Sequence, residues 1–297
     1  MGPSSIIESE SLAVPIQAFP SRANHPHTAD RLRVVTYNVH KCRGLDGRVL
    51  PHRILRVLEE IDADVIALQE VVCREEKSAE RHQARYLAER LGLFCELGEN
   101  RRHRGGAYGN VLLSRYPILH ARNHDISVPG RERRGCLHVE LQPENSAVLH
   151  IFNLHLGTAL YERRMQARQM FGERLFPGAE LSGNKIVLGD FNEWTRGLPS
   201  RLFNLHFESA HSYMDAHRTR TFPGVLPMLP LDHIYFDREL QLDHVRIHRT
   251  PAALMASDHL PVVAEFTLPA ESGNAAVSEQ GAALLPPSTD RLPEARV

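Results

Sequence analysis

Residues 185–192 read Lys-Ile-Val-Leu-Gly-Asp-Phe-Asn and join an apolar strand directly to two polar side chains. The apolar run at 186–188 is typical of a strand that is covered on both faces. Gly189 tolerates an unusual backbone and ends the strand, so Asp190 and Asn192 follow at once. Residues two apart in extended chain point the same way, so a carboxylate and a carboxamide would leave the strand side by side. The alternative is a loop in which both side chains cap backbone amides.

Other predicted strands also finish in polar residues. Their ends are Asn38, Gln69-Glu70, Asn153 with His155, Asp232-His233 and Asp258-His259. Each end has a simpler explanation by itself: Glu70 could begin a solvated loop, His155 could be a satisfied core histidine, and the others could cap turns. The occurrence of all these polar strand ends in one chain needs a common explanation, because buried strands do not usually end in unpaired acids and imidazoles. We therefore expect the sheets to gather these ends at one edge, where ligand clefts open in α/β proteins.

Such an edge would hold four carboxylates, at least two histidines and several carboxamides. This mixture favours a hard divalent cation (magnesium, manganese or calcium), because zinc sites want more cysteine or histidine ligands. Glu70 is a ligand candidate, since magnesium commonly binds only one or two protein carboxylates. The arginines within 101–104 and 131–134 would then face a phosphate. For Arg101 and Arg102 individually, a solvated charged loop is the simpler interpretation.

The predicted helices are inserted irregularly among many strands. We expect helices at 51–61, 81–91, 161–176 and 198–205. We expect strands at 33–40, 64–70, 93–97, 108–114, 137–141, 148–154, 185–190, 231–236, 242–247 and 262–268. Pro51 opens the first helix and Gly92 ends the second. This order predicts sheets stacked as layers with helices outside them.

Composition limits the domain organisation and the partners. The 297 residues show no internal repeat and no linker between 31 and 269, which we predict to be the catalytic domain, with a flexible arm at 1–30 and a disordered tail at 270–297. A net charge of -1 gives no global attraction to nucleic acid or membrane. The four cysteines form no CxxC pair, and most of the 18 histidines are expected at the surface. No apolar run spans a membrane and no secretory signal is visible, so the predicted location is the cytoplasm.

Seven short motifs, in this order and spacing, carry a family resemblance. They are Thr-Tyr-Asn-Val-His at 36–40, Leu-Gln-Glu at 68–70, Tyr-Gly-Asn-Val-Leu-Leu-Ser at 108–114, Asn-Leu-His-Leu at 153–156, Gly-Asp-Phe-Asn at 189–192, Leu-Asp-His-Ile at 231–234 and Ser-Asp-His-Leu-Pro-Val at 257–262. The set resembles the endonuclease/exonuclease/phosphatase superfamily, which includes DNase I-like nucleases, abasic-site endonucleases, neutral sphingomyelinases and inositol polyphosphate 5-phosphatases. The likeness covers about residues 32–268 and is nearest to the short, single-domain bacterial members.

The resemblance implies a four-layer α/β sandwich, in which two mixed β-sheets pack face to face with helices on the outside. It also implies hydrolysis of a phosphoester by in-line attack of water, dependent on Mg²⁺ or alternatively Mn²⁺. By matched position, Glu70 would be the principal metal ligand, with Asn38 beside it. Asp258 would lie at the metal or behind a histidine.

The same matching implies the catalytic and substrate-binding residues. Asp190 would orient or deprotonate the attacking water, and Asn192 would hold a phosphate oxygen. His259 would give a proton or a hydrogen bond to the phosphate, and Asp232 would fix the tautomer of a catalytic histidine. His155 matches the second catalytic histidine of the family. The implied substrate contacts are Tyr108, Asn110, Asn153 and Arg134.

The substrate class stays open at this stage. Residues 250–256 lack the tryptophan that abasic-site endonucleases carry near this point, and Leu231-Asp232-His233 lacks the Trp-x-Asp-Arg of inositol phosphatases. The first hypothesis is a phosphodiesterase or phosphatase that acts on a phospholipid headgroup or another small phosphoester. The second is a DNA or RNA nuclease, which the lack of net basic charge weakens. The third is a non-catalytic binding protein on this scaffold, which the complete motif set disfavours.

Overall fold

The computed structural model describes residues 30–74, 82–144, 146–176 and 181–269, which build two six-stranded sheets. In spatial order, the first sheet contains β11 (Gln241–Ile247), β12 (Val262–Thr267), β1 (Arg31–Asn38), β2 (Val65–Cys73), β4 (Gly106–Ser114) and β3 (Phe94–His103). The second contains β5 (Ile118–Asp125), β6 (Gly135–Leu141), β7 (Leu149–His155), β8 (Asn184–Asp190), β10 (Asp232–Phe236) and β9 (Glu208–Ser209). Except for Asp30, the predicted arm at 1–30 and tail at 270–297 lie outside the described residues.

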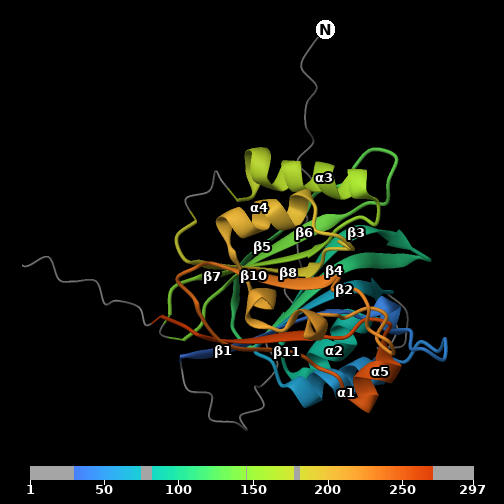
Figure 1. Ribbon diagram of the computed structural model, residues 1–297. Coiled ribbons are helices and arrows are strands. Elements are labelled where there is room, and N and C mark those ends of the chain that lie inside the picture. The colour runs from blue at the N-terminus through green and yellow to red at the C-terminus, as the bar shows by residue number, and fades with distance from the viewer. Residues whose placement is uncertain (1–29, 75–81, 145, 177–180, 270–297) are drawn as a thin grey trace, which may run out of the picture.

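Helices cover the outer faces of both sheets (Figure 1). On the first sheet lie α1 (Pro51–Ile61), α2 (Gln83–Leu91) and α5 (Pro251–Ala256), and on the second lie α3 (Leu160–Gln169) and α4 (Leu198–His206). The predicted four-layer sandwich of two mixed sheets is confirmed. Among the helices of the described ranges, none has the length and apolar character needed to cross a membrane.

The central strands, such as β1 and β8, are buried on both faces because their sequences are apolar at odd and even positions alike. In β1, Val34 points into the core between the sheets and Val35 into the core beneath the helices. In β8, Ile186 and Leu188 enter the core between the sheets, while Val187 packs in the layer of α3 and α4. Truncating one fully buried side chain of this size to alanine typically costs about 2–5 kcal/mol.

Strand pairing brings the polar strand ends together. β1 and β2 are parallel and pair Asn38 with Gln69 where β1 ends, while β2, predicted to finish at Glu70, continues to Cys73. β7 and β8 are also parallel, and they pair His155 with Asp190 at the end of the second sheet. The antiparallel β10 begins there, with Asp232 opposite Asp190. The register therefore collects residues that are far apart in the chain.

Two strand assignments differ from the sequence-based expectation. Arg101 and Arg102, expected in a loop, lie in β3, because the hairpin to β4 turns tightly at Arg104 and Gly105, where φ is 47° and 83°. β5 was not predicted, because most of its residues are polar and partly exposed and they hide its apolar positions.

Two helices also differ. The helix expected over 161–176 ends at Gln169, and a wider turn follows over Met170–Arg174. α5 was not predicted, because it is only six residues long. Oγ1 of Thr250 accepts a hydrogen bond from the backbone N of Ala253 at 3.2 Å, and proline occupies the first turn.

Candidate active site

Gly189 lets the end of β8 approach β7 closely. Its φ is 150°, and a Cβ placed there would lie 1.9 Å from the carbonyl oxygen of Leu154. Only glycine accommodates both the contact and the backbone conformation. The close approach holds Asp190 beside the end of β7, where Nε2 of His155 lies 3.5 Å from Oδ2 of Asp190.

Asp190 is buried at the centre of the candidate site. Its Oδ2 accepts a hydrogen bond from Nδ2 of Asn38 at 2.9 Å, and its Oδ1 accepts one from the backbone N of Asn192 at 2.9 Å. Nε2 of His259 lies 3.8 Å from Oδ2 of Asp190. Burial raises the pKa of Asp190, while His259, His155 and Asn38 act against that rise. One carboxylate thus contacts groups from both sheets.

His259 is held as a cation by carboxylates. Its Nδ1 donates to Oδ2 of Asp232 at 2.8 Å. Burial alone would lower the pKa of His259, but the negative charges of Asp232, Asp190 and Asp258 outweigh it and raise the pKa to about 10. Within the described residues, the second oxygen of Asp232, Oδ1, is buried without a hydrogen-bond partner. The Phe222 ring lies 4.9 Å from the imidazole and covers it.

His155 is held in the opposite protonation state. Burial and the positive charge of Arg134 lower the pKa of His155 to about 4. Nη1 of Arg134 lies 3.2 Å from Nδ1 of His155, and because a guanidinium can only donate, the remaining imidazole proton is on Nε2, facing Asp190. Two histidines whose pKa values are moved apart therefore flank one carboxylate, an arrangement typical of acid–base sites.

Glu70 lies at a distortion within β2, three residues before the strand ends at Cys73. The pairing of β2 with β4 shifts register between Leu68 and Val71, and Glu70 has a φ of 60°. A bulge of this kind re-aims a side chain. Burial alone raises the pKa of Glu70, but the positive charges of Lys41 and of His155, which is protonated only below pH ~4, outweigh it and hold the pKa at about 2. Glu70 is therefore ionised at neutral pH.

Lys41, which the sequence analysis did not identify, forms an ion pair with Glu70. It lies in a 3-10 turn, His40–Cys42, in which every residue has a φ between 45° and 60°. Non-glycine residues seldom adopt this left-handed conformation, and such strain clusters at functional sites. The turn contains no glycine, so nothing in the local sequence marked it.

Two of the residues predicted to hold a metal ion are neighbours, because Nδ2 of Asn38 is 3.5 Å from Oε1 of Glu70. The third, Asp258, has its Oδ1 3.5 Å from Nδ1 of His40. Carboxylate oxygens such as those of Glu70 are hard donors that suit Mg²⁺ or Mn²⁺ better than zinc. Oδ1 of Asn38 accepts from the backbone N of His40 at 3.0 Å, so this carboxamide would have to turn over to offer its oxygen to the same ion.

Three other residues of the site, Asp190, Asp232 and His259, form a second possible ligand group. Each of them places a possible ligand atom within 4.8 Å of those of the other two. The hydrogen bond between Asp232 and His259 already occupies one nitrogen and one oxygen of this trio. The trio is therefore better suited to holding a proton than to holding a cation.

Tyr108 lies on the rim of the site with basic neighbours. The guanidinium of Arg101 is 4.3 Å from the Tyr108 ring centroid, and Nζ of Lys41 is 5.6 Å from it. Burial and the negative charge of Glu70 raise the pKa of Tyr108, which keeps the phenol neutral.

Asn110 and Asn153 lie deeper, between the sheets. Nδ2 of Asn153 donates to the carbonyl oxygens of Leu68 at 3.1 Å and Val111 at 2.9 Å, and its Oδ1 accepts from Nε2 of Gln69 at 2.8 Å. Asn110 donates through Nδ2 to the carbonyl oxygen of Asn153 at 3.2 Å. These amides tie the two sheets together beneath the site, and their role as substrate contacts stays a prediction.

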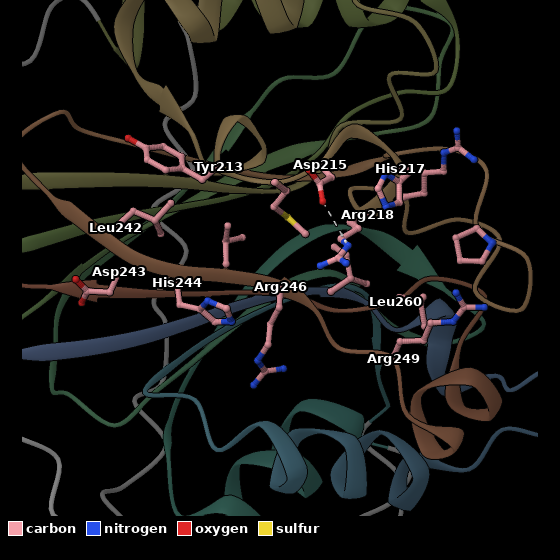
Figure 2. Close-up of a pocket in the computed structure, with 15 residues that line it drawn as sticks. Tyr213, Asp215, His217, Arg218, Leu242, Asp243, His244, Arg246, Arg249 and Leu260 are labelled. Carbon is pink, nitrogen blue, oxygen red and sulfur yellow. Dashed lines mark ion pairs between the residues drawn. The ribbon is translucent and has the colours of Figure 1, made fainter.

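A cavity of about 800 Å³ opens along β11 (Figure 2). Its basic lining residues are Arg218, Arg220, Arg246, Arg249, His217 and His244. Leu260, which follows His259 in the chain, also lines it, but none of the candidate-site residues described above does. The sequence did not indicate this cavity, because its arginines are scattered singly over about thirty positions.

Comparison with known proteins identifies the family. Residues 35–259 match the sequence model of the Endonuclease/Exonuclease/phosphatase family. The chain is 28% identical over 254 residues to YbhP of Escherichia coli K12, an uncharacterized protein, and the alignment covers 80% of this chain and 96% of YbhP.

Solved structures share the fold. An endonuclease/exonuclease/phosphatase from Beutenbergia cavernae is similar with a TM-score of 0.64 and 22% identity, over 80% of this chain and 72% of that one. The catalytic domain of human nocturnin is similar with a TM-score of 0.62 and 20% identity, over 80% and 95% of the two chains. Given the match over residues 35–259, this chain belongs to the endonuclease/exonuclease/phosphatase family, whose members hydrolyse phosphoester bonds.

Proposed function

We propose that this protein is a metal-dependent phosphoesterase that uses in-line attack by water. The observation that carries the proposal is the Asp190 carboxylate, which lies 3.5 Å from the neutral His155 and 3.8 Å from the protonated His259. An ionised carboxylate can orient a water and take its proton, and an imidazolium can stabilise charge on a phosphate.

Each side chain of the site has a defined task in this proposal. Asp190 orients the attacking water and accepts its proton. His259 donates from Nε2 to a phosphate oxygen, because Asp232 already holds its Nδ1 at 2.8 Å. Asn192 donates to Leu156 through one amide hydrogen at 3.0 Å and keeps the other for a phosphate oxygen. Arg134 fixes the proton of His155 on the nitrogen that faces Asp190.

Glu70 and Asn38 are the residues proposed to hold the cation, with Asp258 beside them. When bound, Mg²⁺ or Mn²⁺ supplies charge neutralisation at the phosphate oxygens. The low pKa of Glu70, about 2, keeps this ligand deprotonated over the range in which proteins are usually assayed.

The proposed substrate is a phospholipid headgroup or another small amphiphilic phosphoester. Near the site, Val225, Leu226 and Met228 are 53%, 67% and 57% exposed. Their loop is tied to the catalytic edge, the edge of the two sheets that carries Glu70, Asp190 and His259. The backbone N of Gly224 donates to the carbonyl oxygen of Asp258 at 2.7 Å. Exposed apolar side chains beside a catalytic centre suit contact with a lipid surface. We retain the cytoplasm as the proposed location.

A nucleic acid is the second candidate substrate, and the cavity in Figure 2 favours it. Its four arginines could bind the phosphates of a nucleic acid. The net charge of -1 weighs against tight binding of duplex DNA. A non-catalytic binding protein is the third candidate, and the complete set of acid, base and cation-binding residues weighs against it.

A substrate panel tests these alternatives. Vesicles that contain sphingomyelin or phosphatidylinositol phosphates, glycerophosphodiesters, plasmid DNA and RNA are incubated with Mg²⁺, with and without EDTA. We expect EDTA-sensitive hydrolysis of a lipid substrate that Asp190→Asn abolishes and that Asp46→Asn, at an exposed carboxylate paired with Arg53, leaves intact. Nucleic acid cleavage with the same dependence, and no lipid turnover, would replace the first proposal by the second. No EDTA-sensitive turnover on any substrate would contradict both.

A further inference from the structure

A second group of histidines and a carboxylate lies on the outer face of the second sheet, away from the catalytic edge. The register of β5, β6 and β7 places His120 opposite Glu140 and Glu140 opposite His150. His138 lies two residues before Glu140 in β6, so its side chain points to the same face. Three neighbouring strands, which Figure 1 shows side by side, therefore present three imidazoles around one carboxylate.

The ligand atoms of this group are close together. Nε2 of His138 lies 3.0 Å from Nδ1 of His150, and Nδ1 of His150 lies 4.0 Å from Oε1 of Glu140. The ligand atoms of these three residues all lie within 4.8 Å of one another. Nδ1 of His120 lies 3.9 Å from the same Oε1, on the solvent side.

Neighbouring groups already orient both buried imidazoles. Nε2 of His150 donates to the carbonyl oxygen of Ser182 at 3.2 Å, which leaves the lone pair of Nδ1 facing His138 and Glu140. The His138 ring stacks on Phe152 at 4.2 Å with an interplanar angle of 5°. Ligand histidines in metal sites are commonly fixed by such a hydrogen bond from the opposite ring nitrogen.

We propose that His138, Glu140 and His150 form a second metal site, selective for Zn²⁺ or a similar borderline transition-metal ion. Two imidazole nitrogens and one carboxylate oxygen are a common zinc ligand set, with a fourth position left for water or His120. Two nitrogens bound to one tetrahedral zinc ion are about 3.3 Å apart, from a Zn–N distance of about 2.0–2.1 Å. The observed 3.0 Å needs only a small separation of the two rings.

A hydrogen bond between the two imidazoles is the alternative explanation. In that case His138 donates from Nε2 to His150, and the pair needs no ion. The hydrogen bond explains the 3.0 Å distance but leaves the facing positions of Glu140 and His120 without a reason. Binding of zinc requires His138 to carry its proton on Nδ1 instead, so the two explanations differ in the tautomer of one residue.

The site is independent of the catalytic centre. His150 precedes His155 by five residues in β7, which places the two about 16 Å apart along the strand, on opposite faces of the sheet. An ion at His150 would join β5, β6 and β7 by coordination and stabilise this end of the sheet.

Co²⁺ and Zn²⁺ binding to metal-stripped protein tests the site, with the visible absorption of Co²⁺ and calorimetry of Zn²⁺ as the measurements. The Glu70→Gln variant serves as the background, because Glu70 is the proposed cation ligand of the candidate active site. We expect one equivalent of Zn²⁺ to bind Glu70→Gln, and Glu140→Gln or His138→Gln added to that background to weaken binding at least tenfold. His52→Gln, at an exposed histidine of α1, is the matched control and should bind as the background does.

Circular dichroism establishes that each variant is folded, and Glu140→Gln alone should keep the full phosphoesterase activity. If Glu70→Gln abolishes Zn²⁺ binding while Glu140→Gln leaves it unchanged, the ion belongs to the candidate active site and the proposal is wrong. Failure of the folded wild type to bind Zn²⁺ or Co²⁺ at micromolar concentration also overturns it.

Discussion

The catalytic edge and the histidine group on β5–β7 combine the same kinds of side chain on very different backbone. At the edge, Glu70 and Lys41 have positive φ values and Asp190 follows a glycine that no other residue can replace. On the outer face, His138, Glu140 and His150 lie on regular, paired strands. The edge supplies more oxygen ligands and the outer face more nitrogen ligands. The comparison shows that the strained backbone lies at the proposed catalytic residues, whereas the proposed metal-binding residues on the outer face are brought together by regular strands.

Asp190→Asn should give the largest effect and would separate the two regions most sharply. Loss of the carboxylate that orients and deprotonates water should lower kcat by about 10²–10⁴-fold. Glu140→Gln, the matched change on the outer face, should leave kcat within experimental error. Steady-state kinetics on the best substrate of the panel measures both, and equal losses in the two variants would contradict the distinction between the regions.

Gly189→Ala should destabilise the edge strongly because the added Cβ would overlap the carbonyl oxygen of Leu154. We expect a loss of about 2–4 kcal/mol in the free energy of unfolding. Gly130→Ala is the control, since Gly130 also has a positive φ, 73°, but nothing lies within 4 Å of its Cβ position. Urea denaturation measures the free energy of unfolding of both variants. Equal losses of stability would show that the positive φ, and not the close approach of β7, is the reason that position 189 requires glycine.

Raising the pH should weaken the metal-free protein through His259. Its pKa of about 10 in the folded chain exceeds the usual value of about 6.5, so the stabilisation is complete below pH ~6.5 and is lost as the pH rises through 10. Between pH 7 and 9 this should remove about 2 kcal/mol from the free energy of unfolding. His259→Gln should flatten that part of the curve. An unchanged slope would show that another group titrates there.

Leu226→Ser should give the smallest effect. Removing one exposed apolar side chain should lower activity on lipid vesicles about fivefold, equivalent to about 1 kcal/mol of lost interfacial contact. Activity on a water-soluble phosphoester should stay unchanged, because Leu226 is 67% exposed and makes no part of the catalytic edge. Equal losses on both substrates would place the loop in catalysis and weaken the lipid proposal.

The layering and the catalytic edge were accessible from sequence because both depend on local patterns. Apolar runs such as 186–188 predict strands that are buried on both faces. Polar residues directly after them predict the edge of the sheet at which a ligand cleft forms. The parallel pairing of β1 with β2 and of β7 with β8 then brings Asn38, His155 and Asp190 together.

Other features depend on contacts that no local pattern encodes. Lys41 reaches Glu70 through a left-handed turn without glycine. Most histidines were expected at the surface, and nothing in the sequence singled out His138 and His150, which are buried because Phe152 and the chain at Ser182 cover them. Asn110 and Asn153 belong to the sequence motifs, but the sequence could not show that their side-chain amides already donate hydrogen bonds to backbone carbonyl oxygens.

The hydrogen bond from Asn38 to Asp190 crosses from one sheet to the other. The distance between the two halves of the candidate site therefore depends on the apolar side chains packed between the sheets, such as Val34 and Leu188. A bulkier side chain at one of these positions would move Asn38 and Asp190 apart without altering any polar residue of the site. Evolution within such a sandwich can thus tune turnover from its interior.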